Sequence, residues 1–370
     1  MTTPAEAIVR AEVARRGPLP LEEVVDLALY HPDVGFYSRV GQAGRDGDFL
    51  TSPEVGPLFG AVVARALDTW WQAAGAPHPF VVVEAGAGPG SLARSVLAAR
   101  PACAAALRYV LVERSAAQRA RHAERFSLET EVAAFVADPE IADGDPAGPS
   151  PDGPIVVSRP DLPRLSAPAV VLANELLDNL PFGLLERQPS GWAEVRVDVG
   201  PAGLVERLVP ATTPPELDDA AVGARVPRQR AAARWVREAR ALAGRGGRVV
   251  AIDYASTTDE LATRPWSDWV RTYRRHARGR PVLQDLGEQD ITCEVAVDQL
   301  GVSPTADRSQ ADWLSAHGIA EILAEARQGW RDRAAIGDLA ALRSRSTVSE
   351  GDALLDPSGL GAFRVLEWET

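Results

Sequence analysis

The sequence contains no lysine, so every one of its 39 basic residues is an arginine. A Walker A loop, a pyridoxal Schiff base and a lysine nucleophile each require an ε-amine, and the sequence therefore excludes all three kinds of site. The 51 acidic residues outnumber the arginines and give a formal net charge of −12. This excess of negative charge disfavours a nucleic-acid partner, because phosphate binding needs clustered cations.

Cysteines and long apolar runs are also scarce. Cys103 and Cys293 are the only cysteines, which excludes a disulfide framework and a cysteine-based zinc site. The five histidines never fall at metal-ligand spacing, so we expect no metal. No apolar run reaches the roughly 18 residues of a membrane span. The N-terminal segment carries Glu6 and Glu12 and has no long apolar stretch, so it is unlike a secretory signal. These absences predict a cytoplasmic protein with no membrane partner, while the oligomeric state stays open.

Short apolar segments alternate with helical patterns through the middle of the chain. Because such segments are apolar on both faces, they are typical of a parallel sheet covered by helices on both sides. Two alternating runs around Gly-Pro-Ala-Gly predict a β-hairpin. We therefore expect an α/β, doubly wound sheet. Its parts would be an N-terminal helical extension at 1–78, a core at 79–308 with a hairpin at about 192–210, a helical insertion at 309–350 and a final strand within 351–370.

A glycine-rich turn after the apolar run FVVV is the first candidate binding site. Its acidic and glycine positions are Glu84, Gly86, Gly88 and Gly90. In the dinucleotide fingerprint the third glycine comes one residue later. The spacing here instead resembles motif I of class I S-adenosylmethionine (SAM) methyltransferases. Glu113 ends the next apolar run, where a carboxylate can accept both hydrogens of a ribose diol. The turn therefore favours SAM, with a dinucleotide or no ligand as the alternatives.

A second candidate lies after the apolar run AVVLAN. Asn174, Glu175 and Asp178 stand at the carboxyl end of this predicted strand, the edge where open α/β sheets bind ligands. If a helix begins here, Glu175 and Asp178 share one of its faces. Two carboxylates can clamp a guanidinium, bind an amine or act as general bases. Asn174 or Asp178 could equally be only a helix cap.

The string GDFLTSPE, residues 47–54, is a third candidate. Ser52 is expected to cap a helix that has Pro53 at its first position and Glu54 in its first turn. Because a helix N-terminus attracts polar groups, Ser52 and Glu54 are also candidate cofactor contacts.

Together these motifs resemble the MidA-like SAM-dependent methyltransferases, a family that includes a mitochondrial arginine methyltransferase. The resemblance extends over nearly the whole chain, from HPDVGFYS through GDFLTSPE, EAGAGPG, ANELLDNLP and DITCEVAVDQL to SQADWLSAHGI. It implies a seven-stranded class I methyltransferase core, SAM as methyl donor and a protein arginine acceptor. Departures fall at Ala255, at 268–270 and at Glu294, where the family commonly has glycine, Gly-Thr-Leu and histidine. These departures put the acceptor in doubt more than the cofactor.

The mechanism that follows is an SN2 transfer of a methyl group to an acceptor nitrogen. Glu84, the three glycines, Glu113, Asn174, Ser52 and Glu54 would contact the cofactor, with Glu84 near its ammonium group. Glu175 and Asp178 would be catalytic and hold the acceptor nitrogen, so that most of the rate comes from positioning. Two alternatives remain, a small-molecule methyltransferase of secondary metabolism and a SAM-binding assembly factor with little catalysis.

Overall fold

The computed structural model describes residues 2–39, 51–130, 152–212, 217, 219–274 and 277–370. The chain folds into two compact units whose segments alternate along the sequence. Unit 1 consists of Met1–Phe49, Glu175–Glu238 and Asp253–Ser303. Unit 2 consists of Leu50–Asn174, Ala239–Ile252 and Pro304–Thr370.

Unit 2 is built around a seven-stranded sheet with the order β16-β17-β10-β5-β2-β3-β4. The pairs from β10 to β4 are parallel, and β16 pairs with β17 in the antiparallel direction. The strands are β2 (Phe80–Ala85), β3 (Leu107–Val112), β4 (Ile155–Arg159), β5 (Ala169–Asn174), β10 (Arg248–Asp253), β16 (Ala306–Ser309) and β17 (Arg364–Glu369).

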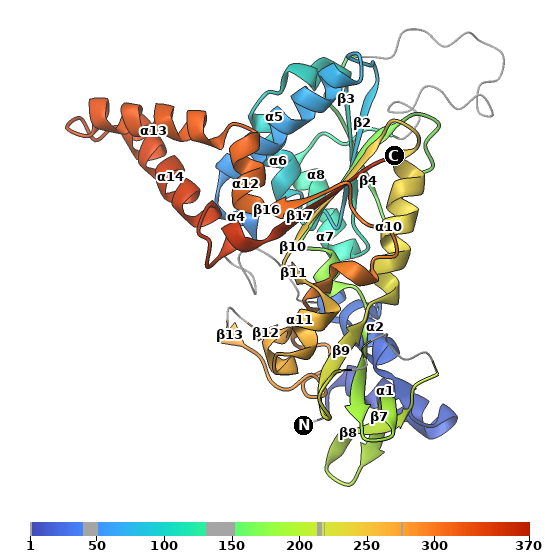
Figure 1. Ribbon diagram of the computed structural model, residues 1–370. Coiled ribbons are helices and arrows are strands. Elements are labelled where there is room, and N and C mark those ends of the chain that lie inside the picture. The colour runs from blue at the N-terminus through green and yellow to red at the C-terminus, as the bar shows by residue number, and fades with distance from the viewer. Residues whose placement is uncertain (1, 40–50, 131–151, 213–216, 218, 275–276) are drawn as a thin grey trace, which may run out of the picture. The chain divides into compact units, whose positions relative to one another are not determined.

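Two strands near the centre of the sheet are buried along their whole length, as their continuous apolar sequences predict. Every residue of β2 and β3 is buried. Figure 1 shows α5 and α6 on one face of the sheet and the end of α10 on the other. The helices of this unit are α4 (Ser52–Val55), α5 (Pro57–Ala73), α6 (Ser91–Ala98), α7 (Ala116–Ala120), α8 (His122–Arg125), α12 (Gln310–Ala316), α13 (Ile319–Arg333) and α14 (Leu339–Leu354). Helix α10 (Arg230–Ala243) runs across the division between the units.

Unit 1 combines helices with three small sheets. Its longest ladder joins β7 to β8, an antiparallel hairpin, and β7 also pairs with β1 and β6. The helices are α1 (Pro4–Arg16), α2 (Leu21–Tyr30), α3 (Phe36–Arg39) and α11 (Thr258–Ala262). The strands are β1 (Leu19–Pro20), β6 (Gly183–Gln188), β7 (Gly191–Gly200), β8 (Gly203–Pro210), β9 (Arg225–Arg228), β11 (Ala255–Ser256), β12 (Val270–Arg274), β13 (Ala277–Arg278), β14 (Asp290–Cys293) and β15 (Val295–Ala296).

The fold class predicted from the sequence is confirmed, since unit 2 has a mostly parallel, doubly wound sheet with helices on its faces. The last strand, β17, inserts beside β10 and makes the sheet mixed. In the part of the chain that the structure describes, no helix is both long and apolar enough to cross a membrane.

Candidate functional site

The glycine-rich turn and Glu113 lie at the same edge of the sheet in unit 2. Strands β2 and β3 are parallel and in register to their last residues, where Ala85 is opposite Val112. The residues that follow, Gly86 and Glu113, therefore leave neighbouring strands at the same level. Gly86, Gly88 and Gly90 have φ values of 69°, 53° and 81°, a region that strongly favours glycine. The sequence EAGAGPG thus encodes the sharp turn that joins β2 to α6.

Glu113 fastens this turn to the end of β3. Its Oε2 accepts a hydrogen bond from the Gly88 amide at 2.9 Å, and its Oε1 accepts one from the Ser115 amide at 2.8 Å. A carboxylate has about four acceptor positions, so each oxygen keeps capacity for a ligand hydroxyl. Burial raises the pKa of Glu113 above its usual range. The carboxylate predicted to bind a ribose therefore also shapes the turn.

Glu84 is buried inside unit 2. Its carboxylate accepts a hydrogen bond from the Tyr109 hydroxyl at 2.7 Å, and only 4% of the residue is exposed. Burial raises the pKa of Glu84 to about 7. The hydrogen bond thus links β2 to β3. The contact between Glu84 and the ammonium group of the cofactor stays a prediction.

Ser52 and Glu54 lie in different surroundings, although they are two residues apart. Ser52 is fully buried and its hydroxyl donates to Gln310 Oε1 at 3.0 Å. Glu54 accepts a hydrogen bond from the hydroxyl of Ser91, the first residue of α6. The expectation that Ser52 caps α4 is wrong, because the N-cap is Thr51. Their cofactor contacts stay predictions, and residues 47–49 of the same motif lie outside the described residues.

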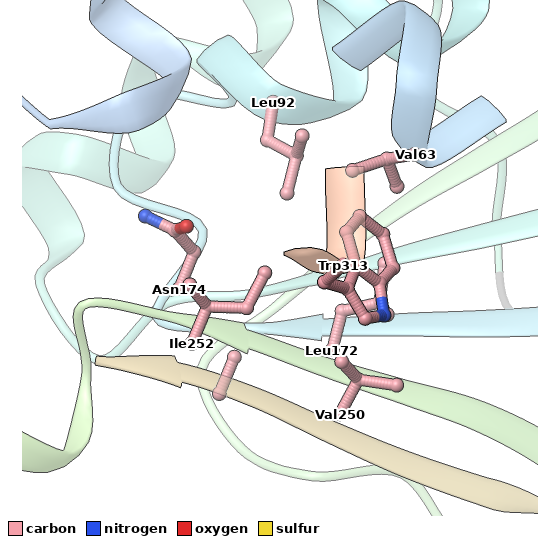
Figure 2. Close-up of a pocket in the computed structure, with 8 residues that line it drawn as sticks. Val63, Leu92, Leu172, Asn174, Val250, Ile252 and Trp313 are labelled. Atoms are coloured by element: carbon pink, nitrogen blue, oxygen red, sulfur yellow. The ribbon is translucent and has the colours of Figure 1, made fainter. Parts of the chain in front are cut away.

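Asn174, at the end of β5, borders a small cavity in unit 2. Figure 2 shows Leu92, Val63 and Trp313 over the strand residues Leu172, Val250 and Ile252. The cavity measures about 10 Å³ and its lining is almost entirely apolar. This volume is about that of one water molecule, which is far below the volume of a pocket that binds a small-molecule substrate.

Glu175 adopts a backbone conformation that is unusual for a glutamate. Its φ is +51°, in the left-handed region that side chains with a Cβ rarely occupy. The helix expected after β5 is only a single 3₁₀ turn, Leu177–Asn179, and Glu175 lies outside it. Glu175 and Asp178 therefore do not share a helical face. Strained residues of this kind are concentrated at functional sites, where the surrounding structure holds them in place.

Asp178 is the central carboxylate of an acidic cluster in unit 1. Only 3% of the residue is exposed, and burial raises the pKa of its carboxyl. Oδ2 accepts a hydrogen bond from the Tyr254 hydroxyl. Oδ1 has no hydrogen-bond partner among the residues that the structure describes. A buried carboxylate oxygen without a donor is energetically unfavourable, and such a group calls for an explanation such as a ligand.

Asp253 explains why the chain turns sharply at Asp178. Its Oδ2 accepts hydrogen bonds from the amides of Leu177 and Asp178, at 2.9 Å and 3.2 Å, and its Oδ1 accepts one from the amide of Tyr254 at 3.0 Å. Burial and the neighbouring charges of Asp178 and Glu175 raise the pKa of Asp253. The side chain therefore fixes both the 3₁₀ turn and the start of the Tyr254 segment.

Asp290 completes the cluster from β14. The Tyr37 hydroxyl donates to its Oδ1 at 3.0 Å, and the Asn179 amide nitrogen donates to both of its oxygens, at 3.1 Å and 3.3 Å. Tyr30 stacks on Tyr37 with ring centroids 5.5 Å apart, and its hydroxyl donates to the Asn179 carbonyl at 3.1 Å. Burial and the charge of Asp178 raise the pKa of Asp290 to about 7. Within unit 1, residues from three distant segments of the chain thus surround Asp178 and its neighbour Asn179.

The raised pKa of Asp290 predicts that folding stability falls as the pH rises. A carboxyl of pKa 3.8 when unfolded and about 7 when folded binds more protons in the folded state at intermediate pH. Its stabilising contribution is complete below about pH 4 and is lost as the pH rises through 7. Urea unfolding should show that Asp290→Asn reduces the loss of stability between pH 5 and pH 8 by about 2 to 3 kcal/mol.

The exposed, helix-capping Asp298 offers a matched control for this measurement. Asp298→Asn makes the same chemical change at an exposed position and controls for the effect of the substitution itself. An unchanged pH dependence in Asp290→Asn would show that Asp290 is already ionised in the folded protein at pH 5.

One departure from the family pattern has a local structural partner. Glu294 stands where the family commonly has histidine. It accepts a hydrogen bond from the Ser256 hydroxyl and forms an ion pair with Arg264, whose nitrogen lies 2.7 Å from Glu294 Oε1. Among the described residues, no group of three or more His, Cys, Asp or Glu side chains could hold a metal ion. His276, another residue of the family motifs, lies outside them.

His122, the first residue of α8, contacts the glycine turn, and the sequence analysis missed this contact. It is completely buried, and its Nε2 lies 2.8 Å from the Gly88 carbonyl oxygen. A Cβ at Gly90 would approach Phe126 to 2.7 Å, so α8 and the residue after it pack directly on the turn. Gly88, the hydrogen-bond partner of His122, is 34 positions away in the sequence, so no local sequence pattern identifies the contact.

Comparisons with known proteins agree with this geometry. Residues 62–314, more than half of the chain, match a family described as "Putative S-adenosyl-L-methionine-dependent methyltransferase". A Burkholderia thailandensis protein solved with S-adenosyl-homocysteine is 29% identical, with a TM-score of 0.79 over 98% of this chain and 91% of that chain. A native structure from the same organism is 28% identical, with a TM-score of 0.77 over 99% of this chain and 91% of that chain.

Two curated relatives are named as protein arginine methyltransferases. The Drosophila melanogaster protein arginine methyltransferase NDUFAF7 homolog, mitochondrial, is 34% identical over 195 residues, which are 52% of this chain and 44% of that protein. The Homo sapiens protein arginine methyltransferase NDUFAF7, mitochondrial, is 30% identical over 228 residues, 58% of this chain and 50% of that protein. The chain thus spans about half the length of these relatives. Their mitochondrial names overturn the cytoplasmic location expected from the sequence.

Proposed function

Because this chain belongs to the family of S-adenosyl-L-methionine-dependent methyltransferases, we propose that it methylates a guanidinium nitrogen of a protein arginine. The observation that carries the proposal is the buried carboxylate of Asp178, whose Oδ1 has no hydrogen-bond partner among the described residues. A guanidinium presents planar pairs of N–H donors that match a carboxylate. The relatives named as protein arginine methyltransferases support the same acceptor.

The glycine turn of unit 2 fits the cofactor. A Cβ placed on Gly88 would meet no atom within 4 Å, so the turn has an open side that a ligand can approach. Glu113 stands beside it and keeps acceptor capacity for a ribose diol. SAM, when bound, supplies an electrophilic methyl group and leaves as S-adenosyl-homocysteine. We assign the turn and Glu113 to the cofactor, with Glu84, Asn174, Ser52 and Glu54 as further candidate contacts.

The acidic cluster of unit 1 fits the acceptor. Asp178 would accept an N–H of the substrate guanidinium at Oδ1, while the Tyr254 hydroxyl holds Oδ2 and fixes the carboxylate plane. As the new N–C bond forms, the attacking nitrogen must lose one proton. Burial raises the pKa of Asp178, which suits this carboxylate to take that proton at neutral pH. Glu175, one peptide bond from the end of β5, would hold the opposite side of the guanidinium.

Calorimetric titration of SAM and S-adenosyl-homocysteine into the purified protein tests the cofactor assignment, and we expect saturable one-site binding. Transfer of label from methyl-tritiated SAM to arginine-containing peptides tests the acceptor, with the same peptides carrying lysine instead of arginine as the control. Label should appear only on the arginine peptides. Absence of binding by either ligand would overturn the cofactor site. Binding without label on any arginine peptide or protein, but with label on small molecules, would overturn the acceptor.

A further inference from the structure

The peptide groups around Gly88 are held from two sides by residues from outside the glycine turn. The Gly88 amide donates to Glu113 Oε2 at 2.9 Å, and the Gly88 carbonyl lies 2.8 Å from His122 Nε2. Gly88 has no side chain, and a Cβ there would meet nothing within 4 Å. A side chain on Gly88 therefore cannot orient this part of the turn. The two hydrogen bonds orient it together with the backbone hydrogen bond from the Gly90 amide to the Ala87 carbonyl, at 2.8 Å.

The hydrogen bonds define the protonation state of His122. A carbonyl oxygen can only accept, so Nε2 must carry a hydrogen and donate it to Gly88. Nδ1 lies 2.7 Å from Ser158 Oγ and accepts the hydroxyl hydrogen in the neutral ring. Burial lowers the pKa of His122, which favours this neutral form. Ser158 belongs to β4, so the sheet itself fixes the ring that holds the turn.

We propose that His122 is a positioning residue for the cofactor, because it fixes the Gly88 carbonyl and thereby the shape of the turn against which SAM binds. This inference rests on the proposed function, since it assigns the turn to SAM. Glu113 and His122 act on the two ends of one residue: the carboxylate holds the amide and the imidazole holds the carbonyl. Loss of either hydrogen bond lets the flexible glycine backbone rotate. The cofactor then binds more weakly, before any chemical step.

A purely structural histidine would behave differently. Removing a buried side chain that serves only packing lowers the stability of the protein, while the ligand affinity of the remaining folded protein stays the same. A positioning residue changes the affinity of the folded protein for S-adenosyl-homocysteine. The two roles therefore separate when thermal stability and affinity are measured on the same variants.

Two substitutions of His122 that place a side-chain amide at different distances from the backbone provide the test. The Nε2 of glutamine is as many bonds from Cα as the Nε2 of histidine, so His122→Gln can still donate to the Gly88 carbonyl. His122→Asn places its amide at the level of Nδ1 and cannot reach it. We expect His122→Asn to bind S-adenosyl-homocysteine about 10-fold more weakly, and His122→Gln to stay within about threefold of the wild type. Both variants should lose thermal stability.

His317 provides the matched control. It also belongs to unit 2, and its ring packs against Trp313 with centroids 4.4 Å apart, far along the chain from the turn. His317→Asn should lower thermal stability and leave the affinity for S-adenosyl-homocysteine unchanged. Ser158→Ala is a milder second variant, which removes the partner of Nδ1 and should weaken binding about threefold.

The outcomes distinguish this inference from the function on which it rests. Wild-type affinity in His122→Asn and Ser158→Ala would overturn the role of His122 and leave the methyltransferase site intact. Equal weakening in the asparagine and glutamine variants would show that the hydrogen bond to the Gly88 carbonyl does not determine the affinity, which also overturns it. Failure of the wild type to bind either SAM or S-adenosyl-homocysteine would instead overturn the proposed cofactor site.

Discussion

Replacing Asp178 by asparagine should lower the turnover of an arginine peptide about 100-fold while leaving the affinity for S-adenosyl-homocysteine unchanged. Asparagine has the same shape as aspartate and can still accept the hydrogen bond from Tyr254. Its amide group, however, places an N–H donor at the position of Oδ1, where it opposes the N–H donors of a guanidinium. The variant also lacks a carboxylate to take the proton that the attacking nitrogen releases.

Single-turnover kinetics with labelled SAM measures this effect, with calorimetry on the same protein. Asp298→Asn makes the same chemical change at an exposed position of unit 1 and should match the wild type in both measurements. If Asp178→Asn also loses affinity for S-adenosyl-homocysteine, Asp178 must be assigned to the cofactor site. Unchanged turnover would remove the acidic cluster from the acceptor site.

The cofactor turn could be predicted from the sequence because its chemistry is local. An apolar strand, closely spaced glycines and a helix follow one another between 80 and 98, and Glu113 directly follows the next strand. Parallel pairing then brings the strand ends to one level without further information. His122 could not be found in this way, because Gly88 and Ser158 lie 34 and 36 positions from it. Only the packing of α8 on the turn reveals its role.

The acidic cluster illustrates a second limit of sequence reasoning. Tyr37 and Asp290 are bonded to each other across 253 positions, so their meeting depends on the tertiary fold. A helix after β5 would have placed Glu175 and Asp178 on one face, because they are three residues apart. Instead, the Asp253 carboxylate accepts hydrogen bonds from the backbone amides of Leu177 and Asp178, and these bonds support a 3₁₀ turn. Side chains that bind backbone amides compete with regular helices, and spacing alone cannot show this competition.

Glu113→Gln should weaken S-adenosyl-homocysteine binding about 30-fold. In the wild type both carboxylate oxygens accept backbone hydrogen bonds, one from Gly88 and one from Ser115. A glutamine can accept only one of these and must direct its own N–H groups at the other amide. The ribose loses a charged acceptor at the same time, and hydrogen bonds to charged groups contribute about 1.5 to 3 kcal/mol each.

Ribose recognition and support of the turn can be separated with a 2′-deoxy analogue of S-adenosyl-homocysteine. If Glu113 binds the ribose, the wild type should bind the deoxy analogue at least 10-fold more weakly than the parent, and Glu113→Gln should bind the two almost equally. Glu124→Gln, at an exposed position of α8, is the matched control and should discriminate like the wild type. If the variant still discriminates fully between the two ligands, Glu113 supports the turn alone and another group binds the ribose. The same titrations thus show whether Glu113 binds the ribose or only supports the turn.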